Sequence, residues 1–294
     1  MPVVVVGNLI VGGAGKTPTT LAVLHLLRAF GWQPGVISRG HGRRGQAVLE
    51  VDRHCDASDC GDEPLLIHLR TSAPVVVGRD RVAAARALCK AHPEVNILVA
   101  DDGLQHHRLA RDLQVIVFDE RGAGNGLLLP AGPLREPLPQ NVPGNTLVLY
   151  NAARVTTPLP GWLARRRQSG AVALAAWWRG ERPAADSWQA LQDRPLLAAA
   201  GMAAPERFFE MLRDQGLQLS LTRPLPDHHA FDTLPWRDDT PDVVITEKDA
   251  VKLRPERLAQ GGAATRVWVV PLDLEPDVAF AAALKRHFPH PPKY

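Results

Sequence analysis

Ile10-Val-Gly-Gly-Ala-Gly-Lys-Thr17 closely follows the apolar run Val3–Val6, and this stretch decides the fold. An apolar strand, a Gly-rich turn and a helix from Thr17 to about Phe30 together form the pattern of a phosphate-binding loop. The backbone N–H groups of such a turn bind polyphosphate together with the N-terminus of the helix. In this motif the lysine reaches the β- and γ-phosphates, and the threonine hydroxyl binds Mg²⁺. The sequence therefore predicts a site for a nucleoside triphosphate.

The loop departs from the general G-x-x-x-x-G-K-[ST] pattern, because Ile10 stands where the first glycine is expected. An ordinary glycine-rich turn before a helix is the alternative, but the strand–turn–helix context favours the phosphate loop. The predicted nucleotide-binding residues are Gly12, Gly13, Gly15, Lys16 and Thr17.

Composition indicates a globular protein of 294 residues, with 45% hydrophobic and 22% charged residues. The formal net charge of +3 is too small to suggest nucleic acid as a partner. Cys55, Cys60 and Cys89 lack the spacing of metal ligands and fit reduced thiols in the cytoplasm. No feature indicates an obligate protein partner.

Residues 1–150 alternate short apolar runs with helical stretches, which predicts a parallel sheet covered by helices on both faces. Ligands of such sheets bind beyond the carboxyl ends of the strands. The apolar runs are Val3–Val6, Gly35–Ser38, Ala73–Val77, Asn96–Ala100, Gln114–Phe118 and Thr146–Tyr150.

Residues 151–294 are predicted to form a linker, up to about Asp193, and a second, smaller α/β domain that completes a cleft with the first. The linker is rich in Arg, Pro, Ala and Trp. The expected strands and helices are Leu196–Ala200, Pro205–Gln215, Leu217–Leu221, Val243–Thr246, Val267–Val270 and Val278–His287. The predicted boundary between an ATP-binding domain and the rest is therefore at residue 150.

The strand Ile97–Ala100 ends in two carboxylates, Asp101 and Asp102. Phosphate-loop proteins hold Mg²⁺, directly or through water, at such a strand end. A helix N-cap is the alternative, since Asp caps helices well. The phosphate loop favours the metal, so we predict a Mg²⁺ site here.

Arginines stand at neighbouring strand ends, in Ser38-Arg39-Gly40 and in Gly78-Arg79-Asp80-Arg81. Guanidinium groups bind phosphate through two parallel hydrogen bonds, which favours a phosphate-rich cleft over flexible basic loops. Gln105, His106 and His107 follow the two acids and either position a reacting group or are polar loop residues.

Gly61-Asp62-Glu63-Pro64 precedes a helix. Asp62 therefore either stabilises the helix N-terminus or takes a proton from a substrate hydroxyl. The proline-rich segment Leu129–Pro137 presents the pair Arg135 and Glu136. Asp227-His228 places a carboxylate beside an imidazole, a pairing that is more often structural than catalytic. Thr246-Glu-Lys-Asp249 does not match N-K-x-D, which counts against a GTPase.

Together these segments resemble the tetraacyldisaccharide 4′-kinase (lipid A 4′-kinase) family. The set spans nearly the whole chain, and the family loop also has the pattern V-G-G-x-G-K-T, so Ile10 is no departure from this family. The matching segments are Val5–Pro18, Ser38–Gly40, Gly61–Pro64, Val77–Arg81, Asp101–His106, Gly124–Gly126, Leu129–Pro137, Asp227–His229 and Thr246–Asp249.

The resemblance implies a P-loop kinase-like fold and transfer of the γ-phosphate of ATP, with Mg²⁺, to the 4′-hydroxyl of a tetraacylated glucosamine disaccharide 1-phosphate. This reaction belongs to lipid A biosynthesis. The implied catalytic residues are Asp62 as general base, His228 as its aid, and Lys16. The implied metal ligands are Thr17, Asp101, Asp102 and Glu136. The implied substrate-binding residues are Arg39, Arg79, Arg81, Gln105 and Arg135.

The resemblance also implies a lipid-linked substrate and the cytoplasmic face of the bacterial inner membrane. Family members usually begin with an apolar helix, whereas this sequence starts beyond it and has no apolar run near the roughly 18 residues that span a bilayer. Either this start is internal to the gene, or the protein attaches peripherally to the membrane. For peripheral attachment, an interfacial patch of basic and Trp side chains is one candidate, with core packing as its alternative. The residues of this patch are Arg165, Arg166, Arg167, Trp162, Trp177, Trp178 and Trp188. Two functions are the alternatives. One is a P-loop hydrolase, which the missing N-K-x-D disfavours where it would be a GTPase. The other is a nucleotide switch, which would need neither Asp62 nor His228.

Overall fold

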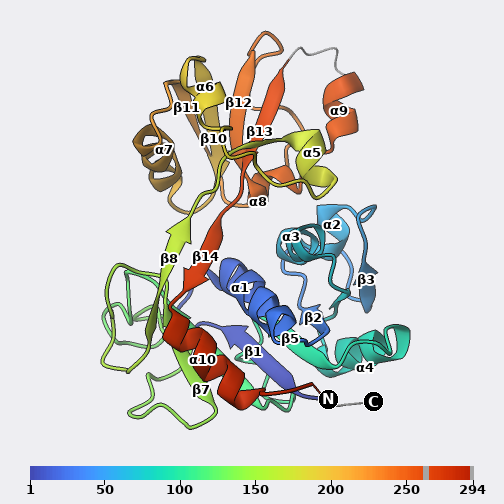
Figure 1. The fold of residues 1–294 in the computed structure, drawn as a ribbon, viewed down its shortest axis with the longest axis vertical. Coiled ribbons are helices and arrows are strands. Elements are labelled where there is room, and N and C mark those ends of the chain that lie inside the picture. Colours follow the sequence, from blue (N-terminus) through green and yellow to red (C-terminus); the bar gives the residue numbers. More distant parts are fainter. Residues whose placement is uncertain (261–264, 292–294) are drawn as a thin grey trace. The chain divides into compact units, whose positions relative to one another are not determined.

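The computed structural model describes residues 1–260 and 265–291 (Figure 1). The chain forms two compact units, of which unit 1 comprises Met1–Arg167 with Asp273–Tyr294 and unit 2 comprises Gln168–Leu272. Each unit is built on its own β-sheet. The predicted α/β fold with a large, mainly parallel sheet and a second, smaller sheet is therefore confirmed.

Within the described residues, unit 1 is built on a nine-stranded sheet in the order β14-β8-β7-β6-β1-β5-β2-β4-β3. All its strand pairs are parallel except β3 with β4 and β14 with β8, at the two edges. The strands are β1 (Val3–Gly7), β2 (Pro34–Ser38), β3 (Leu49–Val51), β4 (Val75–Val77), β5 (Ile97–Asp101), β6 (Leu113–Phe118), β7 (Thr146–Tyr150), β8 (Trp162–Arg167) and β14 (Asp273–Pro276).

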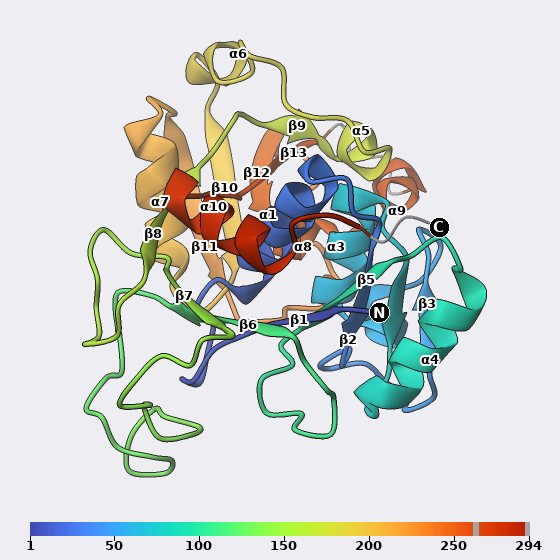
Figure 2. The ribbon, with the colours of Figure 1, turned by 60° about the horizontal axis from the view of Figure 1, so that its bottom comes forward.

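The strand β1 lies between β5 and β6 in the middle of this sheet (Figure 2). All five of its residues are buried, which explains the run of valines, since β-branched side chains suit a strand that is covered on both faces. Each buried valine contributes about 1.5–3 kcal/mol of hydrophobic stabilisation. In the register of β1 with β5, Val6 is paired with Asp101, so the phosphate loop and the acidic pair leave the sheet side by side.

The helices of unit 1 cover this sheet. The helix α1 packs on β1 and β5, and α4 packs beside β2 and β4 (Figure 2). The observed start of α1 at Lys16 matches the helix that the sequence predicts. The helices are α1 (Lys16–Ala29), α2 (Ala57–Cys60), α3 (Asp62–Thr71), α4 (Arg81–Ala91) and α10 (Val278–His287).

Unit 2 has a five-stranded sheet, counted over the part of the chain that is described, in the order β11-β10-β12-β13-β9. Only β9 is antiparallel to its neighbour. The strands are β9 (Val172–Ala173), β10 (Leu196–Gly201), β11 (Leu219–Leu225), β12 (Asp242–Thr246) and β13 (Arg266–Val270). The helices are α5 (Leu174–Trp178), α6 (Gln189–Gln192), α7 (Pro205–Asp214), α8 (Glu247–Ala250) and α9 (Pro255–Gln260).

The two units divide at a different point from the boundary expected at residue 150. The strand β8 pairs with β7 and extends the sheet of unit 1 to Arg167. After unit 2 the chain returns as β14, which pairs antiparallel with β8, and as α10, which lies beside β7 in Figure 1. Phe280 of α10 is fully buried and packs edge-on against Trp162, with 5.9 Å between the two ring centroids. The last helix was assigned to the second domain because its pattern continues the same alternation of strands and helices.

The tryptophans of the expected interfacial patch pack largely inside the two units. Trp177 and Trp178 are 3% and 9% exposed, and their ring nitrogens donate to Glu247 Oε1 (2.9 Å) and the Leu253 carbonyl (3.0 Å). Trp188 packs against the core of unit 2. The core-packing alternative therefore holds for these side chains. Among the helices within residues 1–260 and 265–291, none has the length and hydropathy of a membrane-spanning segment.

Candidate functional site

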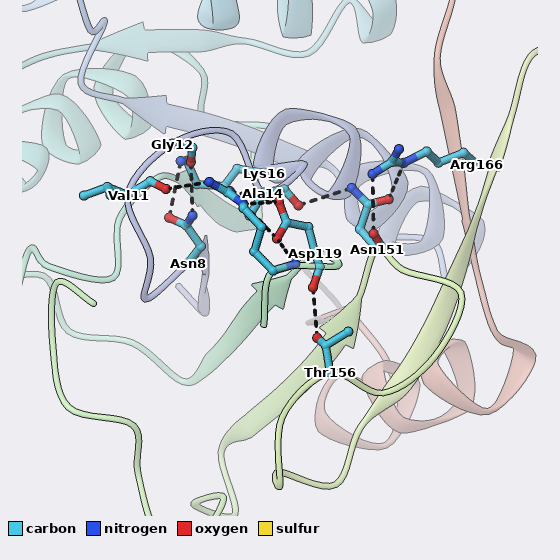
Figure 3. Close-up of polar contacts among 10 residues, drawn as sticks. Asn8, Val11, Gly12, Ala14, Lys16, Asp119, Asn151, Thr156 and Arg166 are labelled. Carbon is cyan, nitrogen blue, oxygen red and sulfur yellow. Dashed lines mark hydrogen bonds and ion pairs between the residues drawn. The ribbon is translucent and has the colours of Figure 1, made fainter. Parts of the chain in front are cut away.

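The carbonyl groups of the phosphate loop are held from outside the loop (Figure 3). Asn8 Nδ2 donates to the Gly12 carbonyl at 3.3 Å, and Asn151 Nδ2 donates to the Ala14 carbonyl at 3.2 Å. Arg121 Nη1 donates to the carbonyl of Val11 at 3.2 Å. In a planar trans peptide the C=O and the following N–H point in opposite directions. The N–H groups that follow these carbonyls are therefore directed to the other side, where an anion would bind.

Lys16 lies at the start of α1 and is only 8% exposed. Its Nζ atom donates to Asn8 Oδ1 at 3.3 Å and forms an ion pair with Asp102 Oδ2 at 3.7 Å. Asp102 has a φ of 49°, in the left-handed region that Asp tolerates better than most residues. The end of β5 and the phosphate loop are thus joined by the ion pair between the Asp102 carboxylate and the Lys16 ammonium group.

Arg135 and Gln105 extend this cluster. Arg135 Nη1 lies 3.6 Å from Asp102 Oδ1 and donates to Gln105 Oε1 at 3.3 Å. Gln105 Nε2 in turn donates to the carbonyl of Asn8 at 3.3 Å. Together with Lys16 these residues form a closed polar ring, which brings four of the sequence-predicted site residues together.

Asp101 is completely buried, in contrast to Asp102. It accepts hydrogen bonds from Thr20 Oγ1 (2.8 Å) and Ser38 Oγ (3.4 Å), which tie β5 to α1 and β2. Burial raises the pKa of its carboxyl to about 7, and the negative charge of Glu63 adds to the rise. Of the acidic pair, only Asp102 is therefore partly exposed.

A cavity of about 780 Å³ opens at this edge of the unit 1 sheet. Five arginines and two aspartates line it, so its wall carries a net positive charge. All five residues predicted to bind substrate line it, beside Asp102. The lining residues are Arg39, Gln46, Val48, Arg79, Asp80, Arg81, Asp102, Gln105, His106, Arg108 and Arg135.

Arg81 and Asp80 fix one wall of this cavity. Arg81 is 6% exposed as a residue. Its guanidinium group donates to the Arg79 carbonyl at 3.0 Å and to the Asp102 carbonyl at 3.4 Å. Burial, with the charge of Arg39, lowers its pKa. Asp80 caps α4 by accepting from the Val82 and Ala83 amides. Arg81 thus holds the backbone of Asp102 in place as well as lining the cavity.

The segment around Asp62 packs against the segment around Arg39 through two glycines. A Cβ at Gly40 would come within 2.7 Å of the Cys60 carbonyl oxygen, and a Cβ at Gly61 within 3.0 Å of the Gly40 Cα atom. Neither position has space for a side chain. Asp62 itself is half-buried in the first turn of α3, beside this contact.

Two further predicted residues, Glu136 and His228, are not among the side chains that line the cavity. Glu136 Oε1 lies 3.9 Å from His107 Nε2, and no described contact joins this carboxylate to Asp101 or Asp102. His228 is exposed in unit 2, has a φ of 60°, and lies 4.0 Å from Asp227. Its approach to Asp62 remains a prediction.

Thr246-Glu-Lys-Asp249 has a structural role in unit 2. Thr246 caps α8 by accepting from the Asp249 amide, and it donates through Oγ1 to Asp249 Oδ2 at 2.7 Å. Asp249 is fully buried and also accepts from the Gly201 amide at 3.0 Å. This segment therefore stabilises the end of β10.

Sequence reasoning missed the side chains that hold the phosphate loop from outside, namely Asn8, Arg121 and Asn151. The sequence held a signal for Asn8 and Asn151, since each is a polar residue directly after an apolar strand. In the structure each is at most 4% exposed. The sequence held no signal for Arg121, because its contact with the loop crosses more than a hundred residues of sequence.

The sequence model of the family described as tetraacyldisaccharide-1-P 4′-kinase matches residues 1–289. A tetraacyldisaccharide 4′-kinase of Methylibium petroleiphilum is 62% identical over 284 residues, which cover 96% of this chain and 79% of the relative. A tetraacyldisaccharide 4′-kinase of Leptothrix cholodnii is 55% identical over 289 residues, which cover 98% and 83%.

Among solved structures, LpxK of Aquifex aeolicus, crystallised in complex with ATP, is similar in fold with a TM-score of 0.77. The match covers 98% of this chain and 89% of that one, at 24% identity. It supports the same α/β fold, with one large and one smaller sheet.

Proposed function

The chain belongs to the tetraacyldisaccharide-1-P 4′-kinase family and is therefore an ATP-dependent kinase of lipid A biosynthesis, and on this premise we propose how its residues carry out the transfer. The observation that carries the proposal is the polar ring that joins Lys16, Asp102 and Arg135 at the mouth of a cationic cavity. One side of this ring is the phosphate loop, and the other side is the cavity wall. An ATP γ-phosphate and an anionic acceptor would meet there.

At the ATP end, the phosphate loop binds the triphosphate through its backbone N–H groups. Gly12, Gly13 and Gly15 allow the close approach of phosphate oxygens, and Lys16 neutralises charge on the transferred group. Asp102 partners the Lys16 ammonium, and phosphate oxygens of ATP would be further partners of this group.

Mg²⁺ fits the donor atoms at the end of β5. Asp102 Oδ1 is buried and accepts no hydrogen bond from any residue within 1–260 and 265–291. Mg²⁺ takes one or two carboxylates together with substrate phosphates and water, so a single free carboxylate oxygen suits it. Asp102 and Thr17 would hold the ion, with Asp101 behind them and Glu136 as a further ligand. Bound Mg²⁺ would neutralise charge on the β- and γ-phosphates.

Replacement of Asp102 by asparagine tests this assignment. The variant keeps the size of the side chain and removes one charge, so the Mg²⁺ concentration for half-maximal transfer is expected to rise about tenfold or more. Magnesium titration at saturating ATP measures the change. An unchanged requirement would remove Asp102 from the metal site.

The cationic cavity is proposed to bind the disaccharide 1-phosphate. Arg39, Arg79, Arg81 and Arg135 present guanidinium groups on its wall, and Gln105 adds an amide. Guanidinium groups bind phosphate through paired, charge-assisted hydrogen bonds. The cavity would therefore orient the sugar so that its 4′-hydroxyl faces the γ-phosphate.

Asp62 is the proposed general base, aided by His228. The 4′-hydroxyl oxygen attacks the γ-phosphorus while its proton passes to the Asp62 carboxylate. The bond between the γ-phosphorus and the bridging oxygen breaks, and ADP leaves with that oxygen. Most of the rate comes from positioning and charge neutralisation, since the transfer itself needs little covalent help from the protein.

The substrate is lipid-borne, and we place a membrane contact at the leucine loop, Leu127–Leu129. These side chains are 52%, 45% and 52% exposed, and no acidic residue occurs from Arg121 to Arg135. The base of this loop is hydrogen-bonded to the phosphate-loop segment, because the Val11 amide donates to the Pro133 carbonyl at 2.9 Å. An exposed apolar tip suits insertion into the interface of a bilayer.

Leu128→Ser is expected to weaken binding to phosphatidylglycerol–phosphatidylethanolamine vesicles about fivefold, because a half-exposed leucine then no longer enters the bilayer interface. Co-sedimentation with vesicles measures the fraction of the protein that is bound to lipid. Leu221→Ser is the matched control, since Leu221 is 47% exposed in unit 2. Equal losses in the two variants would rule out the leucine loop as the contact.

An assay with [γ-³²P]ATP and the detergent-dispersed lipid disaccharide 1-phosphate tests the proposed function. Label is expected in the lipid, with a lower KM for the 1-phosphate form than for a disaccharide without it. Release of inorganic phosphate without labelled lipid would instead support a hydrolase. Tight ATP binding with neither product would support a nucleotide switch.

A further inference from the structure

Asn151 and Arg166 form a chain of hydrogen bonds that ends on the phosphate loop (Figure 3). Asn151 Nδ2 donates to the Ala14 carbonyl at 3.2 Å, and Arg166 Nε donates to Asn151 Oδ1 at 2.8 Å. The Arg166 Nη2 group also lies 3.5 Å from the Asn151 carbonyl oxygen. Since the guanidinium occupies the amide oxygen, the NH₂ group of Asn151 is the end that faces the loop.

The peptide between Ala14 and Gly15 is closely fitted to the Asn151 side chain. Gly15 has a φ of 90°, and a Cβ at this position would come within 2.1 Å of Asn151 Nδ2. Asn151 is 4% exposed, and its own amide donates to the Phe118 carbonyl at 2.8 Å, which anchors it to the end of β6. The side chain therefore fixes the orientation of this peptide, with the Gly15 N–H on the side away from Asn151.

Arg166 lies on a ribbon of two strands that carries the chain into and out of unit 2. In the pairing of β8 with β14, Arg166 is opposite Leu274. Unit 2 begins at Gln168, shortly after Arg166, and ends at Leu272, shortly before Leu274. Arg166, which orients Asn151, thus lies in the β8–β14 ribbon, and the chain both enters and leaves unit 2 through this ribbon.

We propose that Asn151 and Arg166 are positioning residues for ATP: they hold the Ala14–Gly15 peptide in its phosphate-binding orientation and couple it to the β8–β14 ribbon. The proposal rests on the proposed function only in taking ATP as the ligand of the loop. Loss of these hydrogen bonds would leave the Ala14 carbonyl without its donor, and the Ala14–Gly15 peptide would be free to rotate. Coupling is reciprocal, so ATP binding is expected to stabilise the ribbon as well.

Binding of the non-hydrolysable analogue AMP-PNP, measured by calorimetry, tests the first part. Asn151→Ala is expected to weaken binding about tenfold, and Arg166→Gln about threefold, with partial recovery in Arg166→Lys. The KM for the lipid is expected to stay within about twofold, since the cavity residues are untouched. Arg165→Ala is the matched control, because its side chain is exposed on the same strand and alternation directs it to the other face.

Hydrogen exchange with and without AMP-PNP tests the coupling. The amides of β8 and β14 are expected to gain protection on binding in the unchanged protein and in Arg165→Ala, and to lose that gain in Arg166→Gln. An analogue affinity within twofold of the unchanged protein for Arg166→Gln would overturn the proposal, as would a full gain of protection. Because Arg166 is exposed, this variant stays informative even if Asn151→Ala fails to fold. Neither readout needs phosphoryl transfer, so failure of the proposed function would be seen separately.

Discussion

Asp62→Asn is expected to lower kcat by about 10²–10⁴-fold while the affinity for ATP changes little. The substitution keeps the shape of the side chain but removes the carboxylate that would accept the proton of the 4′-hydroxyl. The contacts that shape the phosphate loop come from Asn8, Arg121 and Asn151, so they remain in place. Steady-state kinetics and AMP-PNP calorimetry together separate the two quantities.

Asp59→Asn provides the matched control for Asp62→Asn. Asp59 is an exposed acid in the first turn of α2, and Asp62 is a half-buried acid in the first turn of α3. Loss of Asp59 therefore removes a similar favourable charge at a helix N-terminus. Its kcat is expected to stay near that of the unchanged protein. A second comparison uses His228→Gln, which should cost little further activity in the Asp62→Asn background if the two residues act as one unit. Equal losses of ATP affinity and kcat in Asp62→Asn would instead assign Asp62 to the structure of α3.

Lys16→Met is expected to lower kcat by about 10²–10³-fold and to raise the KM for ATP as well. Lys16 is 8% exposed and is held by Asn8 and Asp102, so the position of its ammonium group is fixed by the protein itself. Loss of a fixed cation affects the bound ATP and, more strongly, the charge that develops during transfer. Asp102 keeps Arg135 as a partner, which limits the effect on folding.

Lys90→Met is the control for this variant, since Lys90 is exposed near the end of α4. Thermal unfolding of both variants shows whether either substitution disturbs the fold. Lys16→Arg is expected to remain impaired, because the larger planar guanidinium does not fit the position of a buried ammonium. Full activity of Lys16→Arg would mean that only a positive charge, without fixed geometry, is needed.

The sequence predicted the central part of unit 1 well, because local patterns determine it. Val3–Val6 has the composition of a strand buried on both faces, and it is one. The glycines and the Lys-Thr pair predicted the start of α1 within a residue. The predicted substrate residues line a single cavity because they follow parallel strands, whose carboxyl ends meet at one edge.

The features that sequence reasoning missed depend on contacts between distant segments. Nothing in Val278–His287 shows that this helix packs on unit 1, since that depends on the pairing of β14 with β8. Ile10 is a second example. It is fully buried and paired with Leu134, so the position that lacks the usual glycine joins the phosphate loop to the proline-rich segment. Periodicity and spacing contain no information on such pairings.

The most direct test of the account is the structure of the reaction product. Purified protein, ATP, Mg²⁺ and the tetraacylated disaccharide 1-phosphate are incubated, and the lipid product is analysed by mass spectrometry and by ³¹P–¹H correlation NMR. The account predicts a gain of one phosphate, with the new phosphorus coupled to the proton on the 4′ carbon. A phosphate at another hydroxyl, or ADP formed with unchanged lipid, would contradict it.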